Sequence, residues 1–396
     1  DRERFKNFLL ENNFKQAESG IAKSKEEALK ISKTLGFPIV IRPSYVLGGR
    51  AMKIIHEEKQ LEKYIEDAVK VSGNNPVLID RFLNDAIEVD VDAISDGEKV
   101  FVAGIMEHIE EAGVHSGDSA CSVPPYSLKK EIIKEIEIQT TKLALSLNVI
   151  GLINIQFAVK NEDIYVLEAN PRASRTVPFI SKAIGVPIAR IAARIMAGEK
   201  LKKFNLEKRI SNIFAIKEAV FPFNKFPNVD VLLGPEMKST GEVMGIDENF
   251  GLSFAKSQMA AGNELPIAGT AFISVKDKDK KNALNFAKKL KELNFKLCAT
   301  SGTAKYLNTN GINCKKINKV REGSPHIVES LNAKNIELVI NTTEGSKSIS
   351  DSYSLRRSAL VNKIPYCTSL AAANACIEAI NSLKNKKITV KAIQEL

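Results

Sequence analysis

The sequence has little cysteine, and its cysteines follow no recognisable arrangement. Its 396 residues include five, in no paired spacing and in no spacing that suits a metal ion. We therefore expect free thiols and a reducing, cytoplasmic location rather than a disulfide-stabilised or zinc-binding protein. The five are Cys121, Cys298, Cys314, Cys367 and Cys376.

Long apolar runs are also missing. None approaches the roughly 20 residues that a membrane-spanning helix needs, and no signal peptide is visible. The basic excess is modest, since 57 Lys and Arg against 47 Asp and Glu give +10, and both signs are interleaved along the chain. We therefore expect no membrane and no nucleic-acid partner, and anionic metabolites suit this charge better.

Two common catalytic signatures do not occur. The chain has no Gly-Lys-Ser/Thr of a Walker A loop and no plausible Ser–His–Asp or Cys–His set. A P-loop nucleotide site and covalent catalysis by such a set are therefore not expected. Its length and its 44% hydrophobic share are ordinary for a globular protein of two or three domains.

The most informative segment that is present runs from residue 151 to residue 175. It has the alternation of two strands around a short turn, Asn161-Glu162-Asp163, with Lys160 paired to Ile164. This register places Gln156 opposite Glu168, about 5 Å apart on one face. It also places Asn154 opposite Asn170, so the hairpin face carries a carboxylate and several amides.

Arg172 and Arg175 follow this hairpin directly. A Mg²⁺–polyphosphate site requires clustered oxygen ligands for the metal and nearby guanidinium groups for the phosphates. The alternative is a solvated hairpin face, although Gln and Asn are poor fillers of a β face.

A second candidate phosphate site lies near residues 42–51. Arg42 ends the apolar strand FPIVIR, where it could grip a phosphate or form a surface salt bridge. Gly48 and Gly49 follow in a loop, and glycines allow backbone N–H groups to approach phosphate oxygens. Two glycines alone are weak evidence.

Residues 1–200 are predicted to be α+β, because strands and helices alternate irregularly with several antiparallel neighbours. Residues 201–265 form a connecting region, whose Pro-containing turns argue against one long helix. The predicted strands are 38–42, 77–80, 88–94, 100–109, 151–160 and 163–169, and the predicted helices are 130–147 and 187–196, with a further helix at the start of the chain.

Residues 266–396 show regular β/α alternation, which predicts a small doubly wound sheet whose ligand lies at the carboxyl ends of the strands. The turn Thr300-Ser301-Gly302-Thr303 joins a strand to a helix and could seat an anion. Ordinary βα turn chemistry is the alternative. The predicted strands are 271–275, 296–300, 336–341 and 365–368, and the predicted helices are 281–293, 303–308, 351–361 and 369–383.

Several long motifs give the chain a specific resemblance. The runs NIQFAV, VLEANPRASRTVPFISKA, FPIVIRPSYVLGGRAM, VDVDAI and IMEHIEEAGVHSGDSACSVPPYSL resemble the large-subunit family of carbamoyl-phosphate synthase. The resemblance covers essentially the whole chain. It implies an ATP-grasp fold over residues 1–200, the second such half of the family, and a methylglyoxal-synthase-like regulatory domain over residues 266–396. The chain begins with Asp1 and not with an initiator Met, and the Gly-rich subdomain that the resemblance places before this point is missing. We therefore expect a fragment of a longer polypeptide.

The resemblance implies a ligase activity. This half would phosphorylate carbamate with ATP, within the synthesis of carbamoyl phosphate from bicarbonate, glutamine-derived ammonia and two ATP for pyrimidine and arginine biosynthesis. It implies ATP, two Mg²⁺ or Mn²⁺ ions and K⁺ as an accessory ion. The implied partner is a glutaminase small subunit in a hetero-oligomer.

The resemblance also assigns site residues. Gln156, Glu168 and Asn170 would hold metal, and Arg172 and Arg175 would stabilise the transferring phosphoryl group. The implied ATP contacts are Arg2, Arg42, Gly48, Gly49, Arg81, Leu83, Glu88, Gly113, Val114, His115, Ser116, Gln156 and Glu168. For Glu88, whose spacing alternates with Asp90 and Asp92, a solvent-facing strand position is the alternative.

Two regulatory sites are implied in the same way. A nucleotide monophosphate, UMP or IMP, would bind Lys280, Thr300, Gly302, Thr303, Lys319, Asn341, Thr342 and Thr343. Ornithine would bind Glu110, Asp118, Glu218, Tyr366 and Thr368, because a carboxylate cluster suits an ammonium group.

Two other functions remain open at this point. The chain could be a non-catalytic module that binds a nucleotide monophosphate, or another ATP-grasp ligase that traps an acylphosphate with a different nucleophile. The loop IMEHIEEAGVHSGDSA argues against the second of these.

Overall fold

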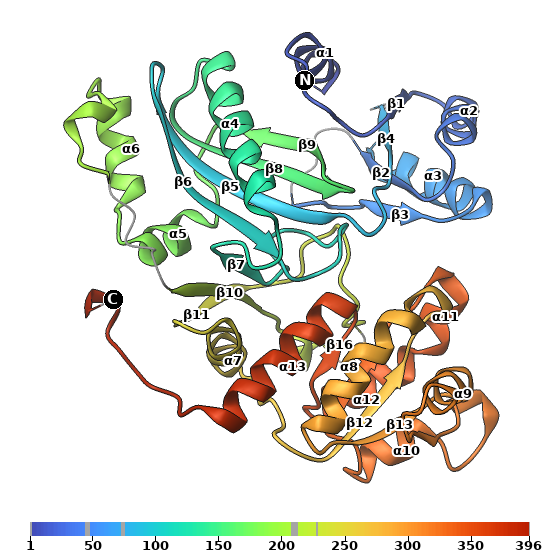
Figure 1. Ribbon diagram of the computed structural model, residues 1–396. Helices are drawn as coiled ribbons and strands as arrows, with labels where there is room; N and C mark the ends of the chain where they lie inside the picture. Colours follow the sequence, from blue (N-terminus) through green and yellow to red (C-terminus); the bar gives the residue numbers. More distant parts are fainter. Residues whose placement is uncertain (1, 44–47, 73–75, 207–212, 227–228, 396) are drawn as a thin grey trace. The chain divides into compact units, whose positions relative to one another are not determined.

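The computed structural model describes residues 2–43, 48–72, 76–206, 213–226 and 229–395 (Figure 1). The chain divides into two compact units. The first comprises Asp1–Asn212, Leu233–Lys238 and Ala392–Leu396, and the second comprises Ile213–Leu232 and Ser239–Lys391.

The smaller sheet of the first unit is antiparallel, with the strand order β1-β4-β2-β3. Alternating buried residues of β2, such as Ile39 and Ile41, form an apolar cluster with side chains of two helices. Ser24 caps the first of these helices, because its hydroxyl accepts from the N–H of Glu27 at 3.2 Å. The elements are β1 (Ser19–Ala22), α2 (Lys25–Leu35), β2 (Ile39–Pro43), β3 (Lys53–Ile55), α3 (Glu58–Ser72) and β4 (Val77–Arg81).

The larger sheet of the first unit is also antiparallel, with neighbours in the order β7-β6-β5-β8-β9. Helix α4 covers one face of it (Figure 1). The elements are β5 (Ile87–Asp96), β6 (Val100–His108), β7 (Cys121–Val123), α4 (Lys130–Ser146), β8 (Ile150–Lys160) and β9 (Asp163–Asn170), together with α1 (Arg2–Glu11), α5 (Val177–Ile184) and α6 (Ile188–Met196).

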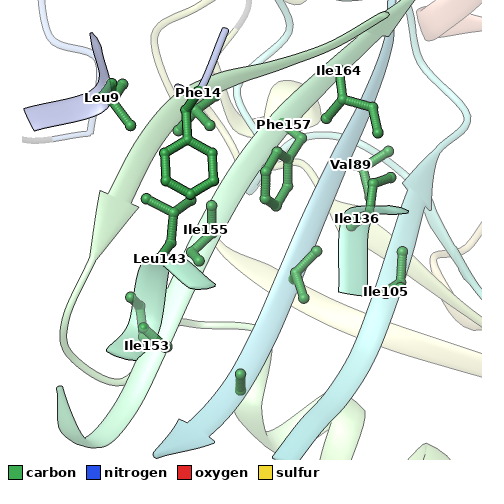
Figure 2. Close-up of a cluster of buried hydrophobic side chains, with 14 of the residues drawn as sticks. Leu9, Phe14, Val89, Ile105, Ile136, Leu143, Ile153, Ile155, Phe157 and Ile164 are labelled. Atoms are coloured by element: carbon green, nitrogen blue, oxygen red, sulfur yellow. The ribbon is translucent and has the colours of Figure 1, made fainter. Parts of the chain in front are cut away.

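The pleat gives this sheet two chemically different faces. Figure 2 shows Val89 of β5 and Ile155 of β8 in the apolar cluster with Ile136 and Leu143 of α4. The residues that alternate with them on β5 and β8 are polar, and they occupy the other face: Glu88, Asp90, Asp92, Asn154 and Gln156. The face opposite the core therefore carries the candidate chemistry.

A β-bulge brings the end of β9 onto that same face. Lys160 pairs with Asp163 across a two-residue turn, so the predicted pairing with Ile164 is wrong. Asn161 and Glu162 both have positive φ, as in the favoured hairpin turns. The register shifts at Leu167, which has no partner on β8, and the predicted pairs of Gln156 with Glu168 and of Asn154 with Asn170 are confirmed.

The bulge decides where the ligands point. Ile164 and Val166 belong to the apolar cluster under α4. An unbroken strand would direct Glu168 to the same side, because residues two apart share a face. The extra residue reverses this alternation, so Glu168 and Asn170 face the polar side.

The second unit contains a parallel sheet with the order β14-β13-β12-β15-β16 and helices between the strands. Strands β10 and β11 form an antiparallel pair within the predicted connecting region. The elements are β10 (Phe214–Val220), β11 (Gly241–Asp247), α7 (Phe250–Ala260), β12 (Thr270–Ser274), α8 (Lys280–Glu292), β13 (Lys296–Ala299), α9 (Ser301–Thr309), β14 (Lys315–Lys316), α10 (Ile327–Asn332), β15 (Leu338–Asn341), α11 (Gly345–Asp351), α12 (Tyr353–Val361), β16 (Tyr366–Cys367) and α13 (Leu370–Asn385).

Most predicted elements are confirmed to within one or two residues at each end. The predicted loop after residue 341 is wrong in part, because the short helix α11 (Gly345–Asp351) forms there. All five cysteines are free, as expected, and the structure shows that all five are also buried. Within the described residues, no helix is long and apolar enough to cross a membrane.

Candidate active site

A cavity of about 660 Å³ opens in the first unit, lined by residues of both sheets. Val40 and Leu78 of the smaller sheet and Ala158 of the larger one contribute apolar walls. Most of the predicted nucleotide and metal residues line it: Arg42, Gly48, Gly49, Arg81, Leu83, Glu88, Gly113, Val114, His115, Ser116, Gln156, Glu168, Asn170 and Arg172. Arg175 does not, and the side chain of Arg2 lies outside the described residues.

The hairpin presents mixed oxygen ligands to this cavity. The amide nitrogen of Gln156 donates to Ser116 Oγ at 3.1 Å, and that of Asn170 donates to Glu168 Oε1 at 2.8 Å. No group of three or more His, Cys, Asp or Glu suited to a metal occurs among the described residues. One carboxylate with amide oxygens is nevertheless a set that fits Mg²⁺, which takes its remaining ligands from water and substrate phosphates.

Arg42 lies at the cavity but is already paired. Its Nη2 donates to Asp80 Oδ2 at 2.6 Å, and both side chains are largely buried. Its Nε is buried without a hydrogen-bond partner. The pair fixes the guanidinium at the cavity wall, and Asp80 is a site residue that the sequence did not single out.

The glycine loop has a structural reason for its composition. Residues 44–47 lie outside the described residues, but Gly48 and Gly49 have φ of 61° and 66°, which disfavours other residue types. A Cβ on Gly49 would lie 1.9 Å from the carbonyl oxygen of Pro235. The N–H of Met237 donates to the carbonyl of Gly48 at 3.1 Å, so the segment 233–238 lies against this loop.

The same distant segment supports residues 113–117, here the histidine loop. The N–H of His115 donates to the carbonyl of Gly234 at 2.8 Å, and the N–H of Gly117 donates to His115 Nδ1 at 3.0 Å. Burial lowers the pKa of His115, which favours the neutral imidazole. Glu88 accepts from the N–H of Gly113 at 2.8 Å and so links this loop to β5.

A chain of buried polar residues extends from Glu88 along the polar face. His108 Nε2 lies 2.9 Å from Asp90 Oδ2, and its Nδ1 lies 3.7 Å from a Glu88 oxygen. Asp90 and Asp92 are 2% and 1% exposed, so their alternation does not indicate a solvated strand. Sequence reasoning did not identify Asp90 and Asp92 as buried, hydrogen-bonded carboxylates, although the motif VDVDAI contains both residues.

The protonation of this chain follows from its burial. Burial raises the pKa of Glu88. Burial alone would lower the pKa of His108, but Cys121 and Asp90 outweigh it and the net pKa is well above the usual value. Burial raises the pKa of Asp92 to about 6, even though hydrogen bonds from Thr176, Asn154 and Ser174 favour its charged form.

The two predicted arginines lie on the exposed segment after β9. Arg172 lines the cavity, and its Nη1 donates to the carbonyl of Ala173 at 2.9 Å. Arg175 lies beside Gly117, where a Cβ would be 2.9 Å from its Nη1. Both guanidinium groups therefore lie near the polar face, one at the cavity and one beside the histidine loop.

A second polar cluster lies at the carboxyl end of β12 in the second unit, where ligands of doubly wound sheets bind. Thr303 Oγ1 accepts from the N–H of Val275 at 3.4 Å, and Thr342 Oγ1 accepts from the N–H of Lys276 at 3.1 Å. Thr300 Oγ1 is 3.3 Å from Ser274 Oγ. Sequence reasoning missed Ser274, the last residue of β12, and Lys276, which directly follows the predicted strand 271–275.

Basic residues surround that cluster. Lys280 pairs with Asp277 at 2.6 Å, and a Cβ on Gly302 would lie 3.3 Å from its Nζ. Lys319 interacts with Asp277 as well, and it lowers the pKa of that carboxylate after the larger effect of Lys280. Asn341 donates to the hydroxyl of Tyr366 at 2.6 Å, and Thr343 follows in the same loop.

The residues predicted to bind an amino acid are divided between the two units. Asp118, in the first, is 1% exposed and accepts from the N–H of Lys238 at 2.8 Å. Burial raises the pKa of Glu110 to about 7, with a further contribution from Glu111. The remaining members, Glu218, Tyr366 and Thr368, belong to the second unit. This site stays a prediction.

Comparison with known proteins identifies the class of both parts. Residues 1–204 match the family "Carbamoyl-phosphate synthase L chain, ATP binding domain", and residues 282–368 match "MGS-like domain". The biotin carboxylase domain of 2-oxoglutarate carboxylase from Hydrogenobacter thermophilus aligns with a TM-score of 0.53 at 19% identity, over 66% of this chain and 64% of that one. N5-carboxyaminoimidazole ribonucleotide synthetase from Thermus thermophilus aligns with a TM-score of 0.51 at 15% identity, over 67% and 73%. The first part is an ATP-grasp ligase domain, and a methylglyoxal-synthase-like domain follows it.

Curated relatives identify the family. The carbamoyl phosphate synthase large chain, C-terminal section, of Aquifex aeolicus is 51% identical over the whole of this chain and 78% of its own length. The large chains of Archaeoglobus fulgidus and Pseudomonas syringae are 54% and 53% identical, again over the whole of this chain. The chain belongs to the carbamoyl phosphate synthase large-chain family. It spans 37% of the length of those two large chains.

Proposed function

We propose that this chain binds ATP in the cavity of its first unit and phosphorylates carbamate to carbamoyl phosphate, as the C-terminal part of a carbamoyl phosphate synthase large chain. The supporting observation is the bulged hairpin, which turns Glu168 and Asn170 onto the same cavity face as Gln156. Arg172 lines the cavity beside them.

Each group has a role that follows from its place. The apolar walls, together with Arg81 and Leu83 at and after the end of β4, accommodate adenine, and Glu88 accepts from the ribose hydroxyls. Gly48 and Gly49 allow close backbone approach to the phosphates. Phosphoryl transfer needs mainly positioning and charge stabilisation, so no nucleophilic side chain is required.

The remaining catalytic groups stabilise charge. Arg172 and Arg175 neutralise the transferring phosphoryl group and the anionic acceptor. Gln156, Glu168 and Asn170 would hold two Mg²⁺ or Mn²⁺ ions, which supply further neutralisation of the phosphate oxygens when bound. The neutral imidazole of His115 adds a polar contact to the nucleotide without an additional charge.

The wider assembly is part of the same proposal. A glutaminase small subunit would supply ammonia in a hetero-oligomer, and K⁺ would act as an accessory ion. UMP or IMP would bind the cluster around Lys280 and Thr303. Ornithine would bind the predicted amino-acid residues Glu110, Asp118, Glu218, Tyr366 and Thr368. We further propose residues 1–200, 201–265 and 266–396 as the ATP-grasp domain, connecting region and regulatory domain.

The substitution Glu168→Gln tests the active site, in an assay that supplies the other parts of the synthase. It removes the one carboxylate of the ligand set while keeping its size, so carbamate-dependent ATP turnover should be lost with the fold intact. Glu162→Gln is the control, because Glu162 lies at the exposed turn of the same hairpin and pairs with Lys129. Turnover of the Glu168→Gln variant at near-normal Mg²⁺ dependence would rule out the assignment.

A further inference from the structure

The segment that carries both arginines connects the larger sheet of the first unit to a helix. Residues 171–176, here the arginine segment, connect Asn170 at the end of β9 to helix α5. Arg172 and Arg175 are exposed. Among the described residues, the side chain of Arg172 bonds only to its near neighbours in the sequence, Ala173 and Asn170, at 2.9 and 3.5 Å, and Arg175 contacts Met237 of the segment 233–238.

Asp92 of β5 joins the arginine segment to the middle of the larger sheet. Its Oδ1 accepts from Ser174 Oγ at 2.8 Å, and its Oδ2 accepts from Thr176 Oγ1. The two hydroxyls also lie 2.7 Å from each other. Because Ser174 and Thr176 flank Arg175 in the chain, one carboxylate fixes the backbone on both sides of that arginine.

The anchor is itself rigidly held. Asn154 of β8 donates to Asp92 at 3.0 Å and lies 3.5 Å from Asp90, whose other oxygen contacts His108. Asn154, Ser174 and Thr176 are neutral donors, so these hydrogen bonds do not compensate the charge of a carboxylate that is 1% exposed. Burying such a carboxylate opposes folding, so its presence needs another reason.

We propose that Asp92 is a positioning residue for phosphoryl transfer, acting through Ser174 and Thr176 to hold the arginine segment against the cavity. This inference rests on the proposed function, because it assigns the segment a catalytic task. Asp92 itself does not line the cavity. Its loss therefore affects the rate of transfer and leaves the binding of adenine and ribose nearly unchanged, since the apolar walls and Glu88 lie outside the arginine segment.

The hydroxyl of Thr176 offers a clean test. Thr176 precedes α5, but its side chain makes no capping hydrogen bond to that helix. Thr176→Val therefore removes the bond to Asp92 while keeping the shape, and Thr176→Ser keeps the hydroxyl. Thr140→Val is the matched control, because Thr140 is a fully buried threonine of α4 in the same unit whose hydroxyl has no hydrogen-bond partner.

The assay is ATP formation from ADP and carbamoyl phosphate by the assembled synthase. We expect Thr176→Val to lower kcat about 100-fold, as misplacement of a catalytic group by about 1 Å does, with the KM for ADP unchanged. Thr176→Ser should restore most of the rate, and Thr140→Val should retain it. If Thr176→Val yields no folded protein, Ser174→Ala replaces it and removes the other hydroxyl.

The outcomes separate this inference from the proposed function. A wild-type enzyme that forms no ATP contradicts the proposed function itself. An active wild type with a normal kcat in Thr176→Val, or in the substitute Ser174→Ala, overturns the positioning role. An equal fall in kcat for Thr140→Val overturns it as well, because that result reflects core packing alone.

Discussion

Replacing the buried carboxylate of Asp92 by an amide should stabilise the protein while it slows catalysis. Burial raises the pKa of Asp92 from 3.8 to about 6. A shift of that size corresponds to about 3 kcal/mol of differential interaction between the two protonation states. Asn carries no charge, so Asp92→Asn should raise the free energy of unfolding by up to about 3 kcal/mol at pH 8.

The pH dependence identifies the cause. The folded-state pKa lies above the unfolded one, so the folded protein binds more protons between pH 4 and pH 6, and stability falls as pH rises through this window. The free-energy cost of burying the ionised Asp92 carboxylate is almost fully present above pH 6. The advantage of Asp92→Asn should therefore be about half as large at pH 5 as at pH 8, and it should vanish as the pH falls well below the unfolded-state pKa of 3.8.

Urea unfolding followed by circular dichroism at pH 5 and pH 8 measures this difference. Asp96→Asn on the same strand is the control of opposite sign. Burial would raise the pKa of Asp96, but backbone N–H groups of Lys99, Leu201 and Glu98 outweigh it and the net pKa is lowered. Asp96→Asn should therefore destabilise at pH 8. The reasoning would be refuted if Asp92→Asn were less stable than wild type at pH 8. It would also be refuted if the substitution changed the free energy of unfolding by the same amount at pH 5 and pH 8.

Two further predictions concern the other binding elements. Gly49→Ala should weaken ATP binding and cost at least about 1–2 kcal/mol of stability, since its φ is positive and a Cβ would meet Pro235. Gly36→Ala is the control, because Gly36 has a similar φ of 74° with no atom within 4 Å of a Cβ, and ATP titration should separate the two. Lys280→Met should abolish the heat of UMP or IMP binding in calorimetry of the whole chain, whereas Lys281→Met should not. Unchanged heat in Lys280→Met would remove that lysine from the proposed pocket.

The hairpin shows how far sequence reasoning reaches. Alternation and residue type predicted the pairing of Gln156 with Glu168, and the structure confirms it. The predicted turn was one residue too long, and the bulge at Leu167 compensated for that error. Nothing in the local pattern signals a bulge, because its cause is the need to place Ile164 and Val166 in the core and Glu168 outside it.

Contacts between distant segments were beyond the sequence pattern. Arg42 was expected to grip phosphate or to form a surface pair, but its partner Asp80 is 38 residues away and largely buried. Asp92 alternates with apolar residues as a solvent-facing position would, and only the packing of Ser174 and Thr176 against it reveals an anchor. The approach of Pro235 to Gly49 depends in the same way on tertiary structure.

The reverse reaction tests the central claim most directly. The assembled wild-type synthase that contains this chain is given ADP, Mg²⁺ and carbamoyl phosphate, and ATP is measured by luciferase. This reaction uses the carbamate-phosphorylating site and needs no glutamine. We expect ATP formation that is lost in Glu168→Gln and retained in Glu162→Gln. ATP formation that persists in Glu168→Gln, or that is missing from an enzyme able to bind ATP, would contradict the account.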